Sequence, residues 1–201
     1  MLPEGFVYIR DVIPSVREDI RYAGSHNFVG CPVDGYFAPR GVLKTEAALA
    51  LKKAAEAFEE KGYGLLIYDA YRPQRAVNHF VRWAKDESDT KMKDEFYPTL
   101  DKSELFPKGY IAVYSGHSRG LTVDLTLTDR DGNALDMGGE FDWFSKISSH
   151  DYEDLAPQQK KNRQLLREGM LAAGFDDYVE EWWHYTFKTE GEKIYYDFPI
   201  E

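Results

Sequence analysis

Two short segments far apart in the chain carry residue types that could bind a metal ion and move a proton. Residues 115–124 read SGHSRGLTVD, with His117 seven positions before Asp124, and residues 181–184 read EWWH. Catalytic zinc sites need three protein ligands, one position for water and a nearby carboxylate that handles the proton. These two segments supply two histidines, an aspartate and a glutamate, so together they indicate a zinc peptidase.

The first segment must place its ligands by a turn and a strand. Apolar residues alternate with threonines and Asp124 along residues 121–127, which predicts a half-buried strand with Asp124 on its polar face. Residues 110–115 are predicted to be a second extended segment. The glycines of residues 116–120 would allow a tight turn that brings His117 over the polar face. The alternative interpretation is an exposed strand with an incidental aspartate and a hairpin histidine.

The second segment leads into an aromatic run, residues 182–187, which predicts another strand. Residues three apart in a regular strand face opposite ways. Glu181 and His184 therefore converge only if Glu181 lies just before the strand or if a bulge or turn intervenes. The alternative is a surface glutamate beside a core histidine. The metal interpretation is favoured because the chain has five histidines and two of them, His117 and His184, fall within the paired pattern.

Both segments resemble motifs of a known family. They match the S-x-H-x-x-G-x-A-x-D and E-x-W-H motifs of the VanX-type D-alanyl-D-alanine dipeptidases, in the wider D,D-peptidase/Hedgehog-like zinc family. Val123 stands where the general motif has alanine, a mild change on the core side of the strand. Further matches follow in order along nearly the whole chain. They are PVDGY at 32–36, GYGLL at 62–66, DAYRP at 69–73, KGY at 108–110, FD at 141–142 and YDFP at 196–199.

The resemblance implies a role for each residue of the site. It implies one zinc ion per chain, bound by His117, Asp124 and His184. Glu181 would be the catalytic base, and Arg72 would stabilise the transition state. Without the resemblance, the position of Arg72 after a strand favours an ordinary loop residue paired with a nearby carboxylate.

The resemblance also implies a substrate. Asp142 would meet the free ammonium group, and Ser115 and Tyr36 would line the dipeptide pocket. The implied activity is zinc-dependent hydrolysis of D-alanyl-D-alanine to two D-alanines. Such a reaction belongs to wall-precursor turnover and is linked either to glycopeptide resistance or to recovery of D-alanine.

Other functions remain open from the sequence. A D,D-carboxypeptidase of the same fold, acting on longer peptidoglycan precursors, would use the same metal set. Asp142 and the match through residues 34–36 favour the dipeptidase over it. A non-catalytic zinc-binding module is disfavoured because a structural site needs neither Glu181 nor Arg72. A zincin protease is disfavoured because the sequence has no H-E-x-x-H.

The length and the remaining patterns predict one α+β domain spanning residues 1–201. We expect a small, mainly antiparallel sheet flanked by helices, with the zinc cleft on one sheet face. The helices are predicted at 45–61, at 74–85 and from Pro157 to near Gly174, and a buried strand is predicted at 63–68. Residues 86–108 are expected to form a long loop that carries at most a short helix.

The charge balance narrows the choice of partners. Acidic residues outnumber basic ones 35 to 25, for a net charge of −10. This argues against nucleic acid and anionic membranes, which favour basic patches. Residues 1–6 lack a basic region followed by a long apolar run, so neither a signal peptide nor a membrane span is predicted. We expect a cytoplasmic enzyme for a small dipeptide, with an aromatic-rich surface that would allow a homodimer.

Overall fold

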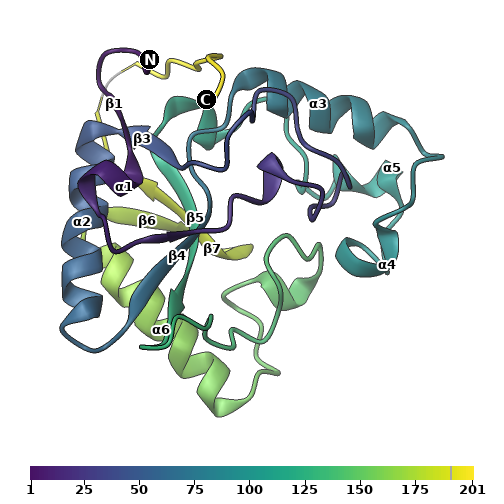
Figure 1. The fold of residues 1–201 in the computed structure, drawn as a ribbon. Helices are drawn as coiled ribbons and strands as arrows, with labels where there is room; N and C mark the ends of the chain where they lie inside the picture. Colours follow the sequence, from purple (N-terminus) through teal and green to yellow (C-terminus); the bar gives the residue numbers. More distant parts are fainter. Residues whose placement is uncertain (191) are drawn as a thin grey trace.

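A five-stranded sheet forms the centre of the molecule in the computed structural model, which describes residues 1–190 and 192–201 (Figure 1). Its strand order is β2-β4-β5-β7-β6. The strands are β2 (Arg17–Glu18), β4 (Gly64–Asp69), β5 (Thr122–Thr128), β6 (Phe175–Tyr178) and β7 (Glu181–Phe187). Among the strand pairs of this sheet, as far as the structure describes the chain, only β2–β4 is parallel. The predicted α+β fold with a mainly antiparallel sheet is therefore confirmed.

Two long helices, α2 (Thr45–Glu59) and α6 (Pro157–Ala172), pack against each other and against the sheet. Figure 1 shows both on one side of it. The buried side of α2 is built largely from alanines, which lets α6 approach closely. At the contact, a Cβ on Gly169 would lie 2.2 Å from the ring of Phe58. Any larger residue at this position would therefore push the two helices apart.

The other side of the sheet carries α3 (Gln74–Lys85), two short helices and long loops (Figure 1). The short helices are α4 (Lys93–Phe96) and α5 (Lys102–Leu105), which lie in the predicted long loop. Nearer the N-terminus, β1 (Phe6–Tyr8) and β3 (Val42–Lys44) form a small antiparallel pair, joined by α1 (Ile9–Val12) and the loops that follow. Three 3₁₀ helices complete the description: η1 (Arg21–Ala23), η2 (Gly116–Arg119) and η3 (Lys146–Ser148).

The predicted helices at 45–61, at 74–85 and from Pro157 are confirmed, as is the strand at 63–68 within one residue. The extended segment expected at residues 110–115 is wrong, because that stretch is a series of bends. Its first amides, on Tyr110 and Ile111, donate back to the carbonyl of Leu105 at the end of α5. These local hydrogen bonds curl the chain and leave no partner strand for a ladder.

The half-buried strand expected at residues 121–127 also needs correction. All seven residues of β5 are buried, including its three threonines. The alternation is correct, but β5 lies between β4 and β7, and the side of the sheet away from α2 and α6 carries α3 and long loops (Figure 1). A polar face of a strand can thus be buried when it lines an active site.

Candidate active site

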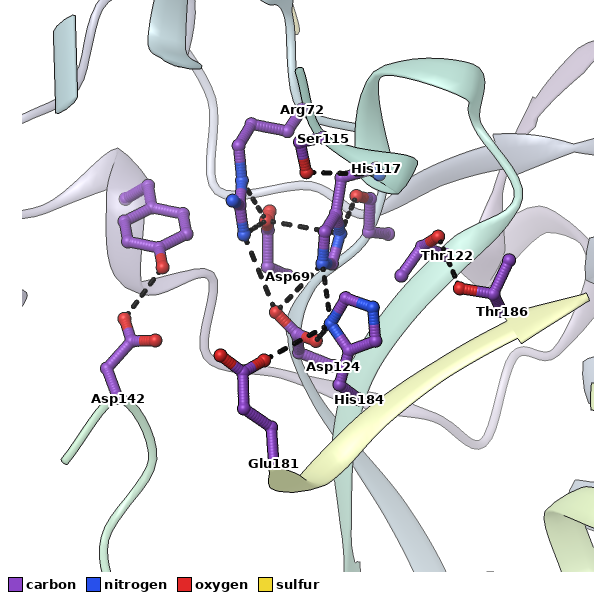
Figure 2. A network of polar contacts seen from close by, with 12 residues as sticks. Asp69, Arg72, Ser115, His117, Thr122, Asp124, Asp142, Glu181, His184 and Thr186 are labelled. Carbon is purple, nitrogen blue, oxygen red and sulfur yellow. Dashed lines mark hydrogen bonds and ion pairs between the residues drawn. The ribbon is translucent and has the colours of Figure 1, made fainter. Parts of the chain in front are cut away.

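Two neighbouring strands carry two of the predicted metal ligands. Asp124 of β5 lies directly opposite His184 of β7 in the antiparallel ladder, and opposite residues project to the same face. His184 Nδ1 is 3.1 Å from Asp124 Oδ1 (Figure 2). The register of the sheet therefore sets the geometry of this pair.

The third predicted ligand, His117, comes from the 3₁₀ turn that precedes β5. Ser115 begins this turn, and its hydroxyl accepts a hydrogen bond from the His117 amide at 3.3 Å. Gly120 ends it with φ +73°, a conformation that L side chains rarely adopt, and a Cβ there would lie 2.3 Å from Phe6. The turn brings His117 Nε2 to 3.2 Å from Asp124 Oδ2 and 3.3 Å from His184 Nδ1.

These three side chains fit a metal ion. Their donor atoms lie within 4.8 Å of one another. Tetrahedral zinc with bonds of about 2.0–2.1 Å would separate its ligand atoms by roughly 3.3 Å, close to the spacings found here. Asp124 Oδ1 is buried, and its 3.1 Å contact with His184 Nδ1 does not have the geometry of a hydrogen bond. A cation bound between these ligands would satisfy this oxygen. Two nitrogens and a carboxylate oxygen also match the donor types of catalytic zinc sites.

The groups around His117 and Asp124 favour the protonation state that each side chain needs to bind a metal ion. His117 Nδ1 lies 2.7 Å from the carbonyl oxygen of Ala70, which can only accept, so Nδ1 carries the proton and Nε2 presents a lone pair. Burial lowers the pKa of His117 and favours its neutral form. Burial alone would raise the pKa of Asp124, but His117 and His184 beside it outweigh burial and hold that pKa below its usual value.

Glu181 lies beside the three ligands rather than among them. It is the first residue of β7, next to a register shift between Asp177 and Tyr178 in the pairing with β6. The sequence required Glu181 to lie just before the strand or a bulge or turn to intervene. Glu181 is instead the first residue of the strand, directly after the turn at 179–180, and its Oε2 still lies 3.4 Å from His184 Nδ1. Burial raises the pKa of the Glu181 carboxyl. A carboxyl with a raised pKa is better suited to accept and return a proton near neutral pH.

Arg72 is both paired with a nearby carboxylate and close to the predicted metal ligands, so its two possible roles are compatible. Its Nε and Nη2 contact Asp69 Oδ2 at 2.9 and 2.8 Å, so it is paired with the nearby carboxylate. Its Nη2 also lies 3.6 Å from Asp124 Oδ2, at the edge of the ligand cluster. The guanidinium lies over the ring of Tyr22, 4.9 Å from its centroid. Asp69 thus orients Arg72 without taking it away from the cavity.

Asp142 faces the ligand cluster from the opposite side (Figure 2). It is buried and has φ 61°, the only positive φ of a non-glycine residue in the described chain. Such strain is tolerated where the surroundings hold a side chain in a required position. Tyr22 donates a hydrogen bond to Asp142 Oδ2 at 2.7 Å. Burial nevertheless raises the pKa of Asp142 well above the usual value of a carboxyl.

One cavity of about 230 Å³ joins these groups. It is lined by Arg72, Ser115, His117, Asp124, Asp142, Glu181 and His184, with Tyr22, Phe28, Phe80, Tyr110, Tyr114, Phe144 and Tyr178 among the aromatic residues around them. Seven of the eight predicted site residues therefore line a single cavity.

Tyr36, the eighth, needs correction. It is absent from the lining, and its hydroxyl donates to Asp69 Oδ1 at 2.6 Å. Tyr36 therefore supports Asp69 from behind the cavity instead of facing a dipeptide. Sequence reasoning also missed Tyr22, since a single tyrosine in an irregular segment carries no spacing signal.

Comparisons with known proteins agree with this geometry. The family model described as "D-ala-D-ala dipeptidase" matches residues 3–200. The chain is 45% identical over 197 residues to the D-alanyl-D-alanine dipeptidase of Streptomyces coelicolor, covering 97% of this chain and 98% of that one. It is 42% identical over 199 residues to that of Enterococcus faecium, with 98% of each covered.

Among solved structures, the chain is similar to a vancomycin resistance D,D-pentapeptidase VanY in complex with Zn(II), at 14% identity and TM-score 0.43, with 73% of each chain covered. The family and the two relatives, matched over nearly the whole chain, confirm the resemblance seen in the motifs. This chain belongs to the D-Ala-D-Ala dipeptidase family of peptidases.

Proposed function

We propose that this chain hydrolyses free D-alanyl-D-alanine to two D-alanines, with one zinc ion held by His117, Asp124 and His184. The observation that carries the proposal is the convergence of a metal-ligand set, a carboxylate base, a guanidinium and a second carboxylate on one cavity. Pockets for drug-sized ligands measure roughly 300–1,000 Å³. A cavity of about 230 Å³ suits a smaller molecule such as a dipeptide with methyl side chains.

In this proposal the chemistry is divided between the metal and the chain. Zinc bound at these ligands supplies a Lewis acid and a water acidic enough to react near neutral pH. Glu181 takes the proton of the attacking water and passes it to the departing amine as the peptide C–N bond breaks. Arg72, held by Asp69, donates hydrogen bonds to the carbonyl oxygen as that oxygen becomes negative.

Asp142 selects the free dipeptide in this proposal. Tyr22 occupies Asp142 Oδ2, so Oδ1 remains for the substrate's ammonium group. An acylated nitrogen brings no positive charge and would leave a buried carboxylate unpaired, a penalty of several kcal/mol. Terminal D-Ala-D-Ala on a longer peptide is therefore expected to be a poor substrate.

The test compares three substrates with one preparation of the zinc-loaded enzyme. D-Ala-D-Ala, its N-acetylated form and a wall pentapeptide are supplied at equal concentration, and released D-alanine is measured. We expect rapid hydrolysis of the free dipeptide only. A pentapeptide hydrolysed as fast as the dipeptide would replace the proposal with the D,D-carboxypeptidase alternative, and no hydrolysis of any of them would favour the non-catalytic module.

We further propose that residues 1–201 form a single domain that acts in the cytoplasm and can form a homodimer. Its reaction would serve either glycopeptide resistance or recovery of D-alanine. In the part of the chain that the structure describes, no helix has both the length and the apolar character needed to cross a membrane.

A further inference from the structure

Residues 196–201, which we call the C-terminal clasp, lie outside the sheet and the helices yet contact several parts of the active-site scaffold (Figure 1, yellow end). They include the YDFP match at 196–199, to which the reaction described above gives no role. Their contacts fall on the loop that carries Arg72, on the turn that carries His117 and on the start of α3.

The strongest of these contacts joins the clasp to Tyr71, the residue before Arg72. The rings of Tyr71 and Phe198 stack with centroids 4.0 Å apart and an interplanar angle of 12°. The Tyr71 hydroxyl accepts a hydrogen bond from Phe198 N at 2.8 Å and donates one to Phe198 O at 3.1 Å. Tyr71 is fully buried. Both the ring and the hydroxyl of Tyr71 are therefore fixed by one residue of the clasp.

Tyr196 links the two loops of the site through its backbone. Its amide donates to Ser118 O at 2.8 Å, directly after His117 in the chain. Its carbonyl accepts from Gln74 N at 3.1 Å, two residues after Arg72. A single residue of the clasp thus sets the spacing between the segment of the predicted metal ligand and the segment of the predicted oxyanion donor.

Asp197 supplies a helix cap that the local sequence lacks. The N-cap residue of α3 is Pro73, whose side chain can accept no hydrogen bond. Asp197 Oδ1 accepts from the amide of Arg75 at 2.8 Å and from Arg75 Nε at 2.9 Å. A carboxylate at this end of a helix satisfies a free amide and interacts favourably with the helix dipole. The helix that follows Arg72 is thereby anchored to the clasp.

Ile200 begins a second chain of contacts that leads from the clasp to Arg72. It forms a parallel bridge with Tyr36, and its amide donates to Gly35 O at 2.8 Å. Tyr36 in turn holds Asp69 through its hydroxyl. Asp69 orients the guanidinium of Arg72. The clasp is thus linked to Arg72 in two ways. Tyr71 links it to the backbone of Arg72, and Tyr36 and Asp69 link it to the Arg72 side chain.

We propose that the C-terminal clasp positions Arg72 against the metal ligands for catalysis, with Tyr71 as the main positioning residue; this inference rests on the proposed function. Arg72 lies in an irregular loop, and its own backbone contact with the site is one bond from its amide to His117 O at 3.3 Å. Catalytic groups act only when held close to the productive geometry, and a shift of about 1 Å can lower the rate by about 10²-fold. The clasp supplies the constraint that the loop lacks.

The experiment uses the full-length zinc-loaded enzyme with D-Ala-D-Ala. Tyr71→Phe removes both hydrogen bonds to Phe198 and keeps the stacked ring, and Asp197→Ala removes the cap of α3. We expect each to lower kcat, by about tenfold or more for Tyr71→Phe, with KM and zinc content close to those of the wild type. Tyr97→Phe is the matched control, because the Tyr97 hydroxyl donates to Asp89 O at 3.4 Å and contacts neither the clasp nor the loop of Arg72. It should keep the wild-type kcat.

A double-mutant cycle separates positioning from general loss of structure. If Tyr71 acts through Arg72, Tyr71→Phe should add little to the loss already caused by Arg72→Ala, because coupled sites are not additive. Losses that multiply in full would overturn the proposal. Asp197 is 47% exposed, so Asp197→Ala remains informative even if Tyr71→Phe lowers the melting temperature.

The controls also distinguish failure of the proposed role of the clasp from failure of the proposed function. If the wild type is active and the Tyr71→Phe and Asp197→Ala variants have the same kcat as Tyr97→Phe, the role of the clasp is overturned and the proposed function stands. A wild type that holds zinc but does not hydrolyse D-Ala-D-Ala overturns the proposed function and the clasp with it.

Discussion

The candidate site has two sides that are built differently. On the strand side, Asp124, Glu181 and His184 come from β5 and β7. The β5–β7 ladder pairs Asp124 with His184, and the β6–β7 ladder places Glu181. On the loop side, Arg72 and Asp142 lie in irregular segments, placed by contacts with residues distant in sequence. A ladder fixes its side chains through many equivalent backbone bonds, whereas a loop depends on a few specific ones. The strand side should therefore hold two of the three metal ligands firmly, beside His117 from the turn, and the loop side should be sensitive to changes outside the cavity.

The largest effect should follow loss of a strand-side ligand. Asp124→Ala or His184→Ala removes a donor that no neighbouring side chain replaces, so both zinc content and activity should fall to background. Metal analysis of the purified variants beside dipeptide hydrolysis measures both. Full zinc occupancy in either variant would show that the ladder does not hold the metal.

Replacing Glu181 should distinguish metal binding from proton transfer on the strand side. Glu181→Gln keeps the size of the side chain and removes its ability to take a proton, so zinc should stay while kcat falls by about 10²- to 10⁴-fold. Metal content and kcat are measured together. A variant that loses its zinc would instead make Glu181 a ligand.

Arg72 offers the matching test on the loop side. Arg72→Ala should keep its zinc and lower kcat by about 10²- to 10³-fold, the scale for one oxyanion donor. Arg72→Lys should recover little of this, because an ammonium cannot reproduce the two contacts to Asp69. Near-normal rates in Arg72→Ala would reduce Arg72 to a structural partner of Asp69.

A smaller effect, on specificity, should follow from Asp142→Asn. The amide has no charge to offer the ammonium group, so hydrolysis of D-Ala-D-Ala should decrease while the N-acetylated dipeptide is less affected. The ratio of the two kcat/KM values measures the change. An unchanged ratio would show that Asp142 does not face the amine.

The smallest effect concerns stability without metal or substrate. Burial raises the folded-state pKa of Asp142 above its unfolded value, so the folded protein favours the protonated carboxyl. The stability contributed by that protonation is complete below the unfolded pKa of about 3.9 and is lost as the pH rises through the folded pKa. Asp142→Asn stays uncharged, so at neutral pH the metal-free variant should melt at a higher temperature than the metal-free wild type.

This difference in melting temperature should vanish as the pH falls below the unfolded pKa of about 3.9, where Asp142 is protonated in both the folded and the unfolded chain. Thermal melts of both metal-free proteins across this pH range measure it. A variant less stable than the wild type at neutral pH would contradict the assigned direction.

The strand side could be predicted from the sequence because its signals are local. A period of two along residues 121–127 places Asp124 on one face of its strand. The argument about residues three apart expected Glu181 just before the next strand, and it differs by one residue from the observed start at Glu181. The strand was predicted to be half-buried because alternation reports which side chains share a face. Alternation does not show whether loops from other parts of the chain cover the polar face of the strand.

The loop side could be predicted only in part. The motif resemblance named Arg72, Ser115 and Asp142, and all three line the cavity. It also named Tyr36, which faces Asp69 instead, and nothing in the sequence singled out Tyr22. The direction in which a loop side chain points depends on the segment that packs behind it, and no spacing rule encodes that segment.

By itself, then, the sequence determined the donor set, the alternation that aims Asp124 and the order of the long helices and strands, because these follow from residue type and local period. Only the tertiary structure decided that Tyr22 meets Asp142 across 120 residues and that Phe198 meets Tyr71 across 127. Contacts at such separations form when the chain closes on itself and buries their polar groups together. Local patterns cannot select one such pairing among the many that are chemically equivalent.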